Sequence, residues 1–185
     1  MPTKTTMPLL NIIVAVDAVG GFGKNGNIPW NIPEDMQHFK TITTNNICIM
    51  GRITHENMLQ MRKNRILPTG SPPNIPRFVD ILPNRKSFVV TSDKHYDAEG
   101  ATVVPSIRGA IETLDINDTR SVFVIGGEQM FIEALTWTKF IHMTIIKDKT
   151  YECDKYFPIN VINKSFSIVN CTETSELYFV TYQRK

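Results

Sequence analysis

Apolar and polar positions follow two different periods along the chain. Short apolar runs, rich in β-branched residues and ended by glycine or polar residues, have the length of buried strands. Between these runs, apolar residues recur at the spacing of amphipathic helices. The strands predicted in this first part of the chain are Leu10–Val16, Asn46–Met50, Ser87–Thr91, Val103–Val104 and Ser121–Ile125.

The predicted helices begin at residues that suit a helix N-terminus. Pro33 fits a first turn, and Glu34 and Asp35 place acidic groups at the positive end of the helix dipole. Ser106 can cap a helix by accepting a hydrogen bond from a free backbone N–H group. The predicted helices are Pro33–Thr41, Thr54–Gln60, the Ser106-capped helix to Leu114, and Glu128–Leu135.

Only strands are predicted after residue 135. Phe140–Ile146 is an apolar run, and Phe166–Val169 and Tyr178–Tyr182 alternate like an antiparallel hairpin. This order predicts an α/β fold with a mostly parallel central sheet, an antiparallel C-terminal edge hairpin and helices on both faces. We expect one domain over residues 1–185, with an N-terminal tail (1–8) and an inserted surface loop (61–80).

Composition and charge exclude several classes of protein. Hydrophobic residues make up 42% of the chain and charged residues 21%, which are ordinary globular values and exclude whole-chain disorder. Lys plus Arg is 20 and Asp plus Glu is 18, so the net charge is only +2. We therefore expect no nucleic-acid partner; this balance fits a protein that handles a small anionic ligand.

The cysteines and the apolar runs indicate the compartment. Cys48, Cys153 and Cys171 are far apart and odd in number, and none has metal-ligand spacing. We expect neither a disulfide framework nor a metal site, and a reducing, cytoplasmic compartment. Met1–Pro8 has no signal-peptide core, and no run approaches the ~18 apolar residues of a membrane span.

Candidate chemistry lies where predicted strands end, because parallel α/β sheets bind ligands at the carboxyl ends of their strands. The glycine-rich segment Gly20–Trp30 follows the first strand and lets backbone approach a ligand closely. A flexible surface loop explains the same glycines about as well. Gly51–Thr54 and Gly126–Gly127 each end a strand before a helix, where N–H groups can bind phosphate, although tight strand-to-helix turns look the same.

Two charged residues are candidates for direct ligand contact. Asp35 could simply stabilise the helix dipole, or it could be a buried carboxylate that accepts two N–H bonds from a flat heterocycle. Arg85 could bind a carboxylate in a bidentate fashion, or it could be a solvated surface arginine. The four histidines form no spaced set and are interpreted as surface or packing residues.

Taken in order, these segments resemble the dihydrofolate reductase family over almost the whole chain, from about Leu10 to Lys185. The matching segments are Ile13–Val16, Gly23–Trp30, the helix with Asp35 and Phe39, Ile49–Thr54, Leu82–Arg85, Ile125–Gly127, Thr144 and Asp154–Pro158. The resemblance implies NADPH-dependent reduction of 7,8-dihydrofolate to 5,6,7,8-tetrahydrofolate, with hydride transfer to C6 and protonation of N5. It also implies a cytoplasmic monomer of one-carbon metabolism that binds antifolates such as methotrexate.

Site residues follow from the same resemblance. Asp35 would hold the pterin amino group and ring N–H, Thr144 would hydrogen-bond beside it, and Arg85 would pair with the glutamate tail. The implied catalytic residues are Asp35, Thr144, Ile28 and Trp30. The implied substrate-binding residues are Ile13, Asp35, Met36, Phe39, Met58, Leu82, Arg85, Ile125 and Thr144.

The implied cofactor site extends over four segments. The loop up to Ile28 would cover the nicotinamide, Arg52–Thr54 would meet the phosphates, and Thr91 and Ser92 would lie at the adenosine phosphate. The implied cofactor-binding residues are Ala15, Phe22, Gly23, Lys24, Asn25, Gly26, Asn27, Ile28, Arg52, Ile53, Thr54, Thr91, Ser92, Gly126, Gly127, Glu128, Gln129, Met130 and Phe131. The family often joins the two glycines by a cis peptide bond.

Departures from the family pattern leave alternatives open. His55 stands where most members have Trp, and Phe131 stands where Tyr is usual, so the cofactor fit is in question. A riboflavin-pathway pyrimidine reductase, which shares the fold and NADPH, is one alternative; Asp35 and Arg85 favour a pterin with an anionic tail. The other is a non-catalytic folate-binding protein.

Overall fold

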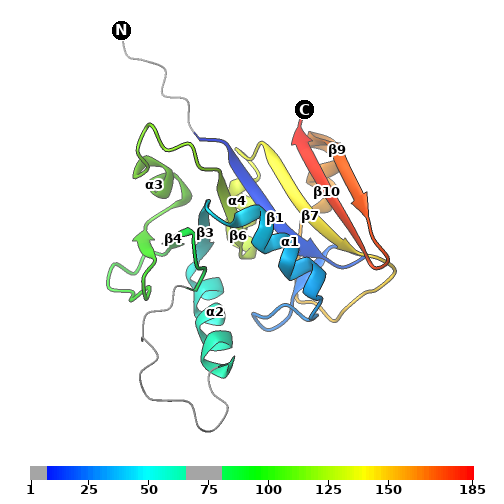
Figure 1. The fold of residues 1–185 in the computed structure, drawn as a ribbon, viewed down its shortest axis with the longest axis horizontal. Helices are drawn as coiled ribbons and strands as arrows, with labels where there is room; N and C mark the ends of the chain where they lie inside the picture. Colours follow the sequence, from blue (N-terminus) through cyan, green and yellow to red (C-terminus); the bar gives the residue numbers. More distant parts are fainter. Residues whose placement is uncertain (1–7, 66–80) are drawn as a thin grey trace.

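An eight-stranded sheet forms the centre of the protein (Figure 1). The computed structural model describes residues 8–65 and 81–185. The strand order is β5-β4-β3-β6-β1-β7-β10-β9. The strands of this sheet are β1 (Leu10–Val16), β3 (Ile47–Gly51), β4 (Lys86–Val90), β5 (Thr102–Val104), β6 (Val122–Gly126), β7 (Phe140–Ile146), β9 (Phe166–Glu173) and β10 (Leu177–Arg184).

The directions of the strands confirm the predicted mixed sheet. Each pairing from β5 across to β7 is parallel, whereas β10 runs antiparallel to both β7 and β9. β1 lies in the middle, between β6 and β7. After β1, the chain builds β3, β4, β5 and β6 on one side of β1, and then crosses to form β7 on the other side. The direction in which strands are added to the sheet therefore reverses beside β1. This reversal is the place where α/β sheets of this kind bind ligands.

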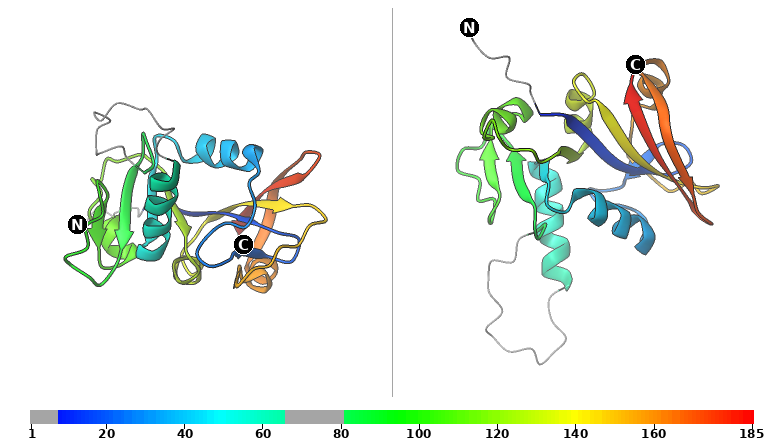
Figure 2. Two further views of the ribbon diagram at one scale, coloured as in Figure 1. Left: turned by 90° about the horizontal axis from the view of Figure 1, so that it is seen from below. Right: turned by 45° about the horizontal axis from the view of Figure 1, so that its top comes forward.

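Helices cover both faces of the sheet, as predicted. The left view of Figure 2 shows α1 on one face and α4 and α5 on the other. The helices are α1 (Pro33–Thr43), α2 (Arg52–Arg65), α3 (Ile107–Glu112), α4 (Glu128–Ala134) and α5 (Ile159–Ser165). Alternate residues of β1, β3 and β6 point to opposite faces, so each strand contributes to two apolar clusters or sites.

The two apolar clusters differ in size. The larger one joins the sheet to α3, α4 and α5 through side chains such as Ile12, Ile107, Phe131 and Ile162. The smaller one joins Met50, Leu82 and Val89 to Phe39 of α1 and Met58 of α2. The face with the smaller core is the face that carries Asp35.

Several predicted boundaries were wrong. α2 begins at Arg52 and continues to Arg65, so residues 61–65 of the predicted 61–80 loop are helical. The rest of that loop and residues 1–7 of the predicted tail lie outside the described residues. β9 and β10 are each longer than predicted, because their hydrogen-bonded pairing continues through polar positions that break the apolar pattern.

The expectation that only strands follow residue 135 was also wrong, since α5 lies between β7 and β9. This helix has only seven residues, too few to show a helical period, and packing of Ile159, Val161 and Ile162 on the larger core stabilises it. A second, two-stranded sheet was missed as well. It pairs β2 (Gly21–Gly23) with β8 (Lys155–Tyr156), which are far apart in sequence.

Candidate active site

Asp35 lies at the start of α1 and is buried, with a relative exposure of 7%. Pro33 occupies the first turn and the helix has no side-chain N-cap, so the carboxyl group is not used for capping. Burial raises the pKa of Asp35 above its ordinary value of 3.8, while Thr144, Trp30 and His38 lower it to a smaller extent. A buried carboxyl group without a cationic partner in contact suits a ligand that supplies N–H donors.

Thr144 and Trp30 approach this carboxyl group from two other elements. Thr144 lies on β7, beside Ala15 of β1, and is 3% exposed. The indole ring of Trp30 packs against Tyr151 at 5.1 Å between centroids. The Trp30 Nε1 atom is buried beside the Asp35 carboxyl group, whose pKa it lowers, but it forms no hydrogen bond of ordinary geometry with a described residue. A donor left unpaired beside a carboxyl group is what a bound ligand or a bridging water would satisfy.

The glycine-rich loop after β1 is held in place rather than free. Asp154 accepts a hydrogen bond from Asn25 N through Oδ2 (2.9 Å), and its own N–H donates to Gly23 O (2.8 Å). Gly26 has φ +77°, and a Cβ there would come within 2.5 Å of the Asn57 side chain of α2. The loop therefore packs against α2, the helix that carries the expected phosphate-binding residues at its N-terminus.

Ile28 lies at the end of this loop and is 48% exposed. The exposure leaves its apolar side chain available to cover a ligand, as the sequence predicts. Phe22 lies differently, because its ring packs edge-on against Phe131 at 5.4 Å and belongs to the border of the larger core. The loop thus combines one anchored aromatic residue with one free apolar residue.

The N-terminus of α2 and the two glycines at the end of β6 lie next to each other. A Cβ on Gly126 or Gly127 would lie 3.4 or 3.3 Å from Thr54 Oγ1. The Gly126–Gly127 peptide bond is cis, as the resemblance predicts. The small residues thus let the backbone pass close to α2. Arg52 lies at the same end of α2, where its Nη1 pairs with Glu56 Oε1 at 2.8 Å.

Arg85 is fixed against the C-terminal end of α1. Its Nε donates to Thr43 Oγ1 (3.0 Å), and its Nη1 donates to Pro83 O (2.8 Å). Its Nη2 has longer bonds to Lys40 O (3.4 Å) and Thr44 Oγ1 (3.3 Å). The guanidinium group is thus oriented by α1, and the long Nη2 bonds are the ones that an anion would most easily replace.

The apolar residues assigned to the substrate fall into two groups. Phe39, Met58 and Ile125 are partly buried and pack around Leu82 on the Asp35 face of the sheet. Ile13 is buried on β1, whereas Met36 is 48% exposed. The structure brings the first group together, and Met36 is not part of that apolar cluster.

The remaining cofactor positions also differ in their accessibility. Ile53 and Ser92 are exposed, whereas Met130 and Phe131 are buried in the larger core. Phe131 is only 2% exposed and packs between Phe22 and Phe157, so its main role is packing rather than direct contact with a cofactor. The missing tyrosine hydroxyl therefore changes the core more than the site.

Sequence reasoning missed four residues that shape the site: Asn57, Tyr151, Asp154 and His38. Asp154 lies in one of the matching family segments, which is the signal that could have identified it. His38 is one turn after Asp35 and stacks on Phe179 of β10 at 4.0 Å. Asn57 and Tyr151 had no sequence signal, since their roles depend on contacts between distant segments.

Comparison with known proteins agrees with this geometry. The sequence profile of the family described as dihydrofolate reductase matches residues 9–71 and 75–184. The chain belongs to the dihydrofolate reductase family. It is 34% identical to the dihydrofolate reductase of Bacillus subtilis over 151 residues, which are 81% of this chain and 76% of that protein. It is 35% identical to the Schistosoma mansoni enzyme over 162 residues, which are 80% of this chain and 77% of that protein.

A solved structure shows the same similarity in three dimensions. The dihydrofolate reductase from Enterococcus faecalis, complexed with NADP(H) and RAB-propyl, superposes with a TM-score of 0.74 at 28% identity. The match covers 97% of this chain and 98% of that chain. Family membership confirms the predicted fold, the NADPH-dependent oxidoreductase class and the reduction of dihydrofolate. In the described part of the chain, no helix is long and apolar enough to span a membrane.

Proposed function

We propose that this chain reduces 7,8-dihydrofolate at the site around Asp35, with that carboxyl group as the residue that holds the pterin and promotes protonation of N5. The observation that carries the proposal is the buried carboxyl group of Asp35 near the reversal of strand order beside β1. Burial raises the pKa of this group. Buried in this way, it can accept two parallel N–H bonds from the amino group and ring N–H of the pterin. Those bonds would replace the interactions with water that the carboxylate loses on burial.

The residues around the glycines fit NADPH. Gly126 and Gly127 leave Thr54 uncovered at the N-terminus of α2, where a Cβ on either glycine would fill the space. Free N–H groups, a hydroxyl and the Arg52 guanidinium suit a diphosphate. When bound, NADPH supplies the hydride for C6. Ala15, Ile28 and the backbone after β6 would hold its nicotinamide ring against the pterin.

The protein's own part in the reaction is binding, orientation and placement of a proton. Asp35 fixes the pterin ring, Thr144 orients the carboxyl group, and Trp30 Nε1, which lies beside that carboxyl group, can hold a water there. That water can pass a proton to N5. The loop around Ile28 excludes bulk water, which strengthens these electrostatic interactions. No covalent intermediate with the protein is needed.

The rest of the substrate would extend from Asp35 toward Arg85. Phe39, Met58, Leu82 and Ile125 form a contiguous apolar surface for the ring and the benzoyl group. Arg85, oriented by the end of α1, would bind the α-carboxylate of the glutamate tail. This arrangement favours a pterin with an anionic tail over a ribityl pyrimidine.

We also propose a single-domain monomer in a reducing, cytoplasmic compartment. All three cysteines are free, with Cys48 buried and Cys171 exposed, which is compatible with such a compartment. Sedimentation of the purified chain tests the monomer, and a species of twice the mass would contradict it.

The deciding experiment mixes the protein with NADPH and dihydrofolate and follows the near-ultraviolet absorbance of the reduced nicotinamide. Methotrexate-sensitive loss of absorbance is expected. Methotrexate binding without turnover would instead indicate a folate-binding protein. Absence of both would contradict a pterin substrate, and riboflavin-pathway pyrimidines would then be assayed.

A further inference from the structure

The departure at His55 creates a buried contact between two elements of the cofactor site. His55 lies in the first turns of α2 and is completely buried, with 0% exposure. Its Nδ1 atom lies 2.7 Å from the hydroxyl oxygen of Tyr96, and the two rings meet edge to face at 5.6 Å. Tyr96 belongs to the segment 91–101 that connects β4 to β5. A side-chain hydrogen bond thus joins this segment to α2.

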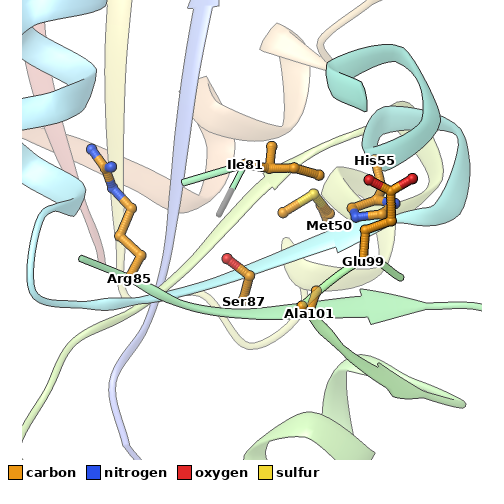
Figure 3. Close-up of a pocket in the computed structure, with 8 residues that line it drawn as sticks. Met50, His55, Ile81, Arg85, Ser87, Glu99 and Ala101 are labelled. Carbon is orange, nitrogen blue, oxygen red and sulfur yellow. The ribbon is translucent and has the colours of Figure 1, made fainter. Parts of the chain in front are cut away.

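The surroundings of His55 are partly polar and incompletely packed. A cavity of about 20 Å³, enough for one water molecule, is lined by His55, Glu99 and Ser87 among others. Figure 3 shows His55, Met50 and Glu99 gathered at one end of this cavity, with Arg85 toward the other. The Nε2 atom of His55 is buried; the Ala98 backbone lies near the ring, but no described residue forms a hydrogen bond of ordinary geometry with Nε2.

Among the described residues, the segment 91–101 has one side-chain hydrogen bond to α2, which is the contact between Tyr96 and His55. Its other side-chain hydrogen bonds in the described structure are local turns: Asp93 N donates to Thr91 Oγ1, His95 N donates to Asp93 Oδ1, and Glu99 N donates to Asp97 Oδ1. Such turns shape the segment but do not fix it relative to α2. Tyr96 also packs at the edge of the smaller core, which adds apolar contact.

The two joined elements are the ones that would bind opposite ends of the same ligand. Thr91 and Ser92 begin the segment and are the expected contacts of the adenosine phosphate. Arg52 and Thr54 immediately precede His55 on α2 and are the expected contacts of the diphosphate. A ligand held by two elements binds more tightly when those elements are already fixed in the bound arrangement, because less ordering is lost on binding.

From this geometry we propose that His55 and Tyr96 are positioning residues for NADPH, which hold the segment 91–101 and the N-terminus of α2 at the separation that the cofactor's phosphates need. The inference rests on the proposed function, because it uses the assigned phosphate contacts. It predicts a role in cofactor affinity and none in the chemical step, since the groups that act on the Asp35 carboxyl are Thr144, Trp30 and His38, and neither His55 nor Tyr96 is among them. It also explains why a histidine can occupy this position: its ring has a specific partner on the neighbouring segment.

The test is Tyr96→Phe, which removes one hydroxyl and keeps the ring in place. We expect the dissociation constant and the KM for NADPH to rise about fivefold, the worth of one buried hydrogen bond, with kcat and the KM for dihydrofolate close to wild type. Tyr182→Phe is the matched control, because Tyr182 is a partly buried tyrosine of β10 that packs on the larger core, away from α2 (Figure 1). His55→Gln, which keeps a polar partner for Tyr96, should restore most of the affinity that His55→Leu loses.

The outcomes separate the inference from the proposed function. If wild type turns over dihydrofolate and Tyr96→Phe binds NADPH as wild type does, the positioning role is wrong and the proposed function stands. An equal loss of affinity for both ligands, together with a lower unfolding midpoint, would show a merely structural contact and also overturn the inference. A wild type that fails to bind NADPH would contradict both.

Discussion

Among the described residues, two aspartates are buried, and they differ in what faces their carboxyl groups. Asp17 follows β1 and is 1% exposed, and Asp35 begins α1 and is 7% exposed. Asp17 accepts three backbone N–H bonds, from Val19 (3.0 Å) and Gly21 (2.8 Å) at Oδ1 and from Tyr151 (2.9 Å) at Oδ2. For Asp35 the neighbours are the side chains of Thr144, Trp30 and His38, and burial raises its pKa.

This difference in hydrogen-bond partners distinguishes a carboxylate with a structural role from one that can bind a ligand. The three donors to Asp17 come from the start of the glycine-rich loop and from the segment after β7, so the carboxylate ties these two segments together. No backbone N–H of the described residues donates to Asp35, whose neighbours are the side chains of Thr144 and Trp30, so part of its acceptor capacity stays available for donors that a substrate brings. Burial alone therefore does not identify a functional acid; the lack of backbone donors does.

The largest expected effect is a loss of turnover in Asp35→Asn that Asp17→Asn does not share. Asp35→Asn replaces an acceptor-only group with an amide that cannot accept both N–H bonds of the pterin, so turnover at neutral pH should fall by roughly 100-fold or more. The unfolding free energy should not fall, because a buried charge is removed. Steady-state rates and urea melts measure both, and wild-type turnover would disprove the role of Asp35 in the proton step.

The opposite pattern is expected for Asp17→Asn. One amide N–H₂ group would face a backbone N–H donor that now lacks an acceptor, so the unfolding free energy should fall by about 1–3 kcal/mol. The kcat of the folded variant should change far less than in Asp35→Asn. Urea melts of the two variants side by side provide the comparison, and a destabilised Asp35→Asn with an unaffected Asp17→Asn would reverse the assignment.

Arg85 is an intermediate case, because α1 uses some of its donors and leaves the longer Nη2 bonds replaceable. Arg85→Leu should weaken dihydrofolate binding by about tenfold, the worth of one charge-assisted pair, with a smaller effect on NADPH. Arg108→Leu is the control, since Arg108 is an exposed arginine that pairs with Glu112 on α3. With a pteroate ligand, which has no glutamate tail, the Arg85→Leu effect should disappear; equal weakening with pteroate would mean that the tail site lies elsewhere.

The smallest expected effect is a pH slope. The folded pKa of Asp35 is raised, so between the unfolded value near 3.8 and that raised value the folded state binds more protons than the unfolded state. Its contribution to stability is therefore complete at low pH and is lost as pH rises through this window. The stability advantage of Asp35→Asn over wild type should be near zero at about pH 4 and larger at about pH 7, as urea melts can measure. A constant difference would contradict the raised pKa.

Much of the fold could be predicted because its strands are short apolar runs with clear ends. Leu10–Val16 and Phe140–Ile146 have the predicted limits, and the hydrophobic pattern alone determined them. β2 and β8 could not be predicted, because two or three residues carry no periodicity and their pairing joins segments far apart in the chain. The helix α5 could not be predicted either, because it is short and its stability comes from packing on a core that other elements form.

The candidate site divides in the same way. Asp35, Arg85 and the glycine pair could be named from the sequence, since an acid at a helix start, an arginine before a strand and two glycines at a strand end carry a chemical signal in their residue types. Asn57, Tyr151 and the contact between His55 and Tyr96 could not, because asparagine, tyrosine and histidine are ordinary residues until a distant partner is known.

The order of the longer strands and helices, the family and the residue types available for chemistry can be predicted from the chain alone, because these depend on local periodicity and on side-chain identity. The fold in three dimensions is what makes one aspartate accept backbone hydrogen bonds and leaves acceptor capacity on the other for a ligand. Hydrogen bonds and burial are properties of groups brought together from distant positions. Asp17 follows an apolar run and Asp35 lies at a helix start, and neither position in the chain shows what will face the carboxyl group. The two acids become different when the segment at Tyr151 reaches one and the side chains of Thr144 and Trp30 reach the other.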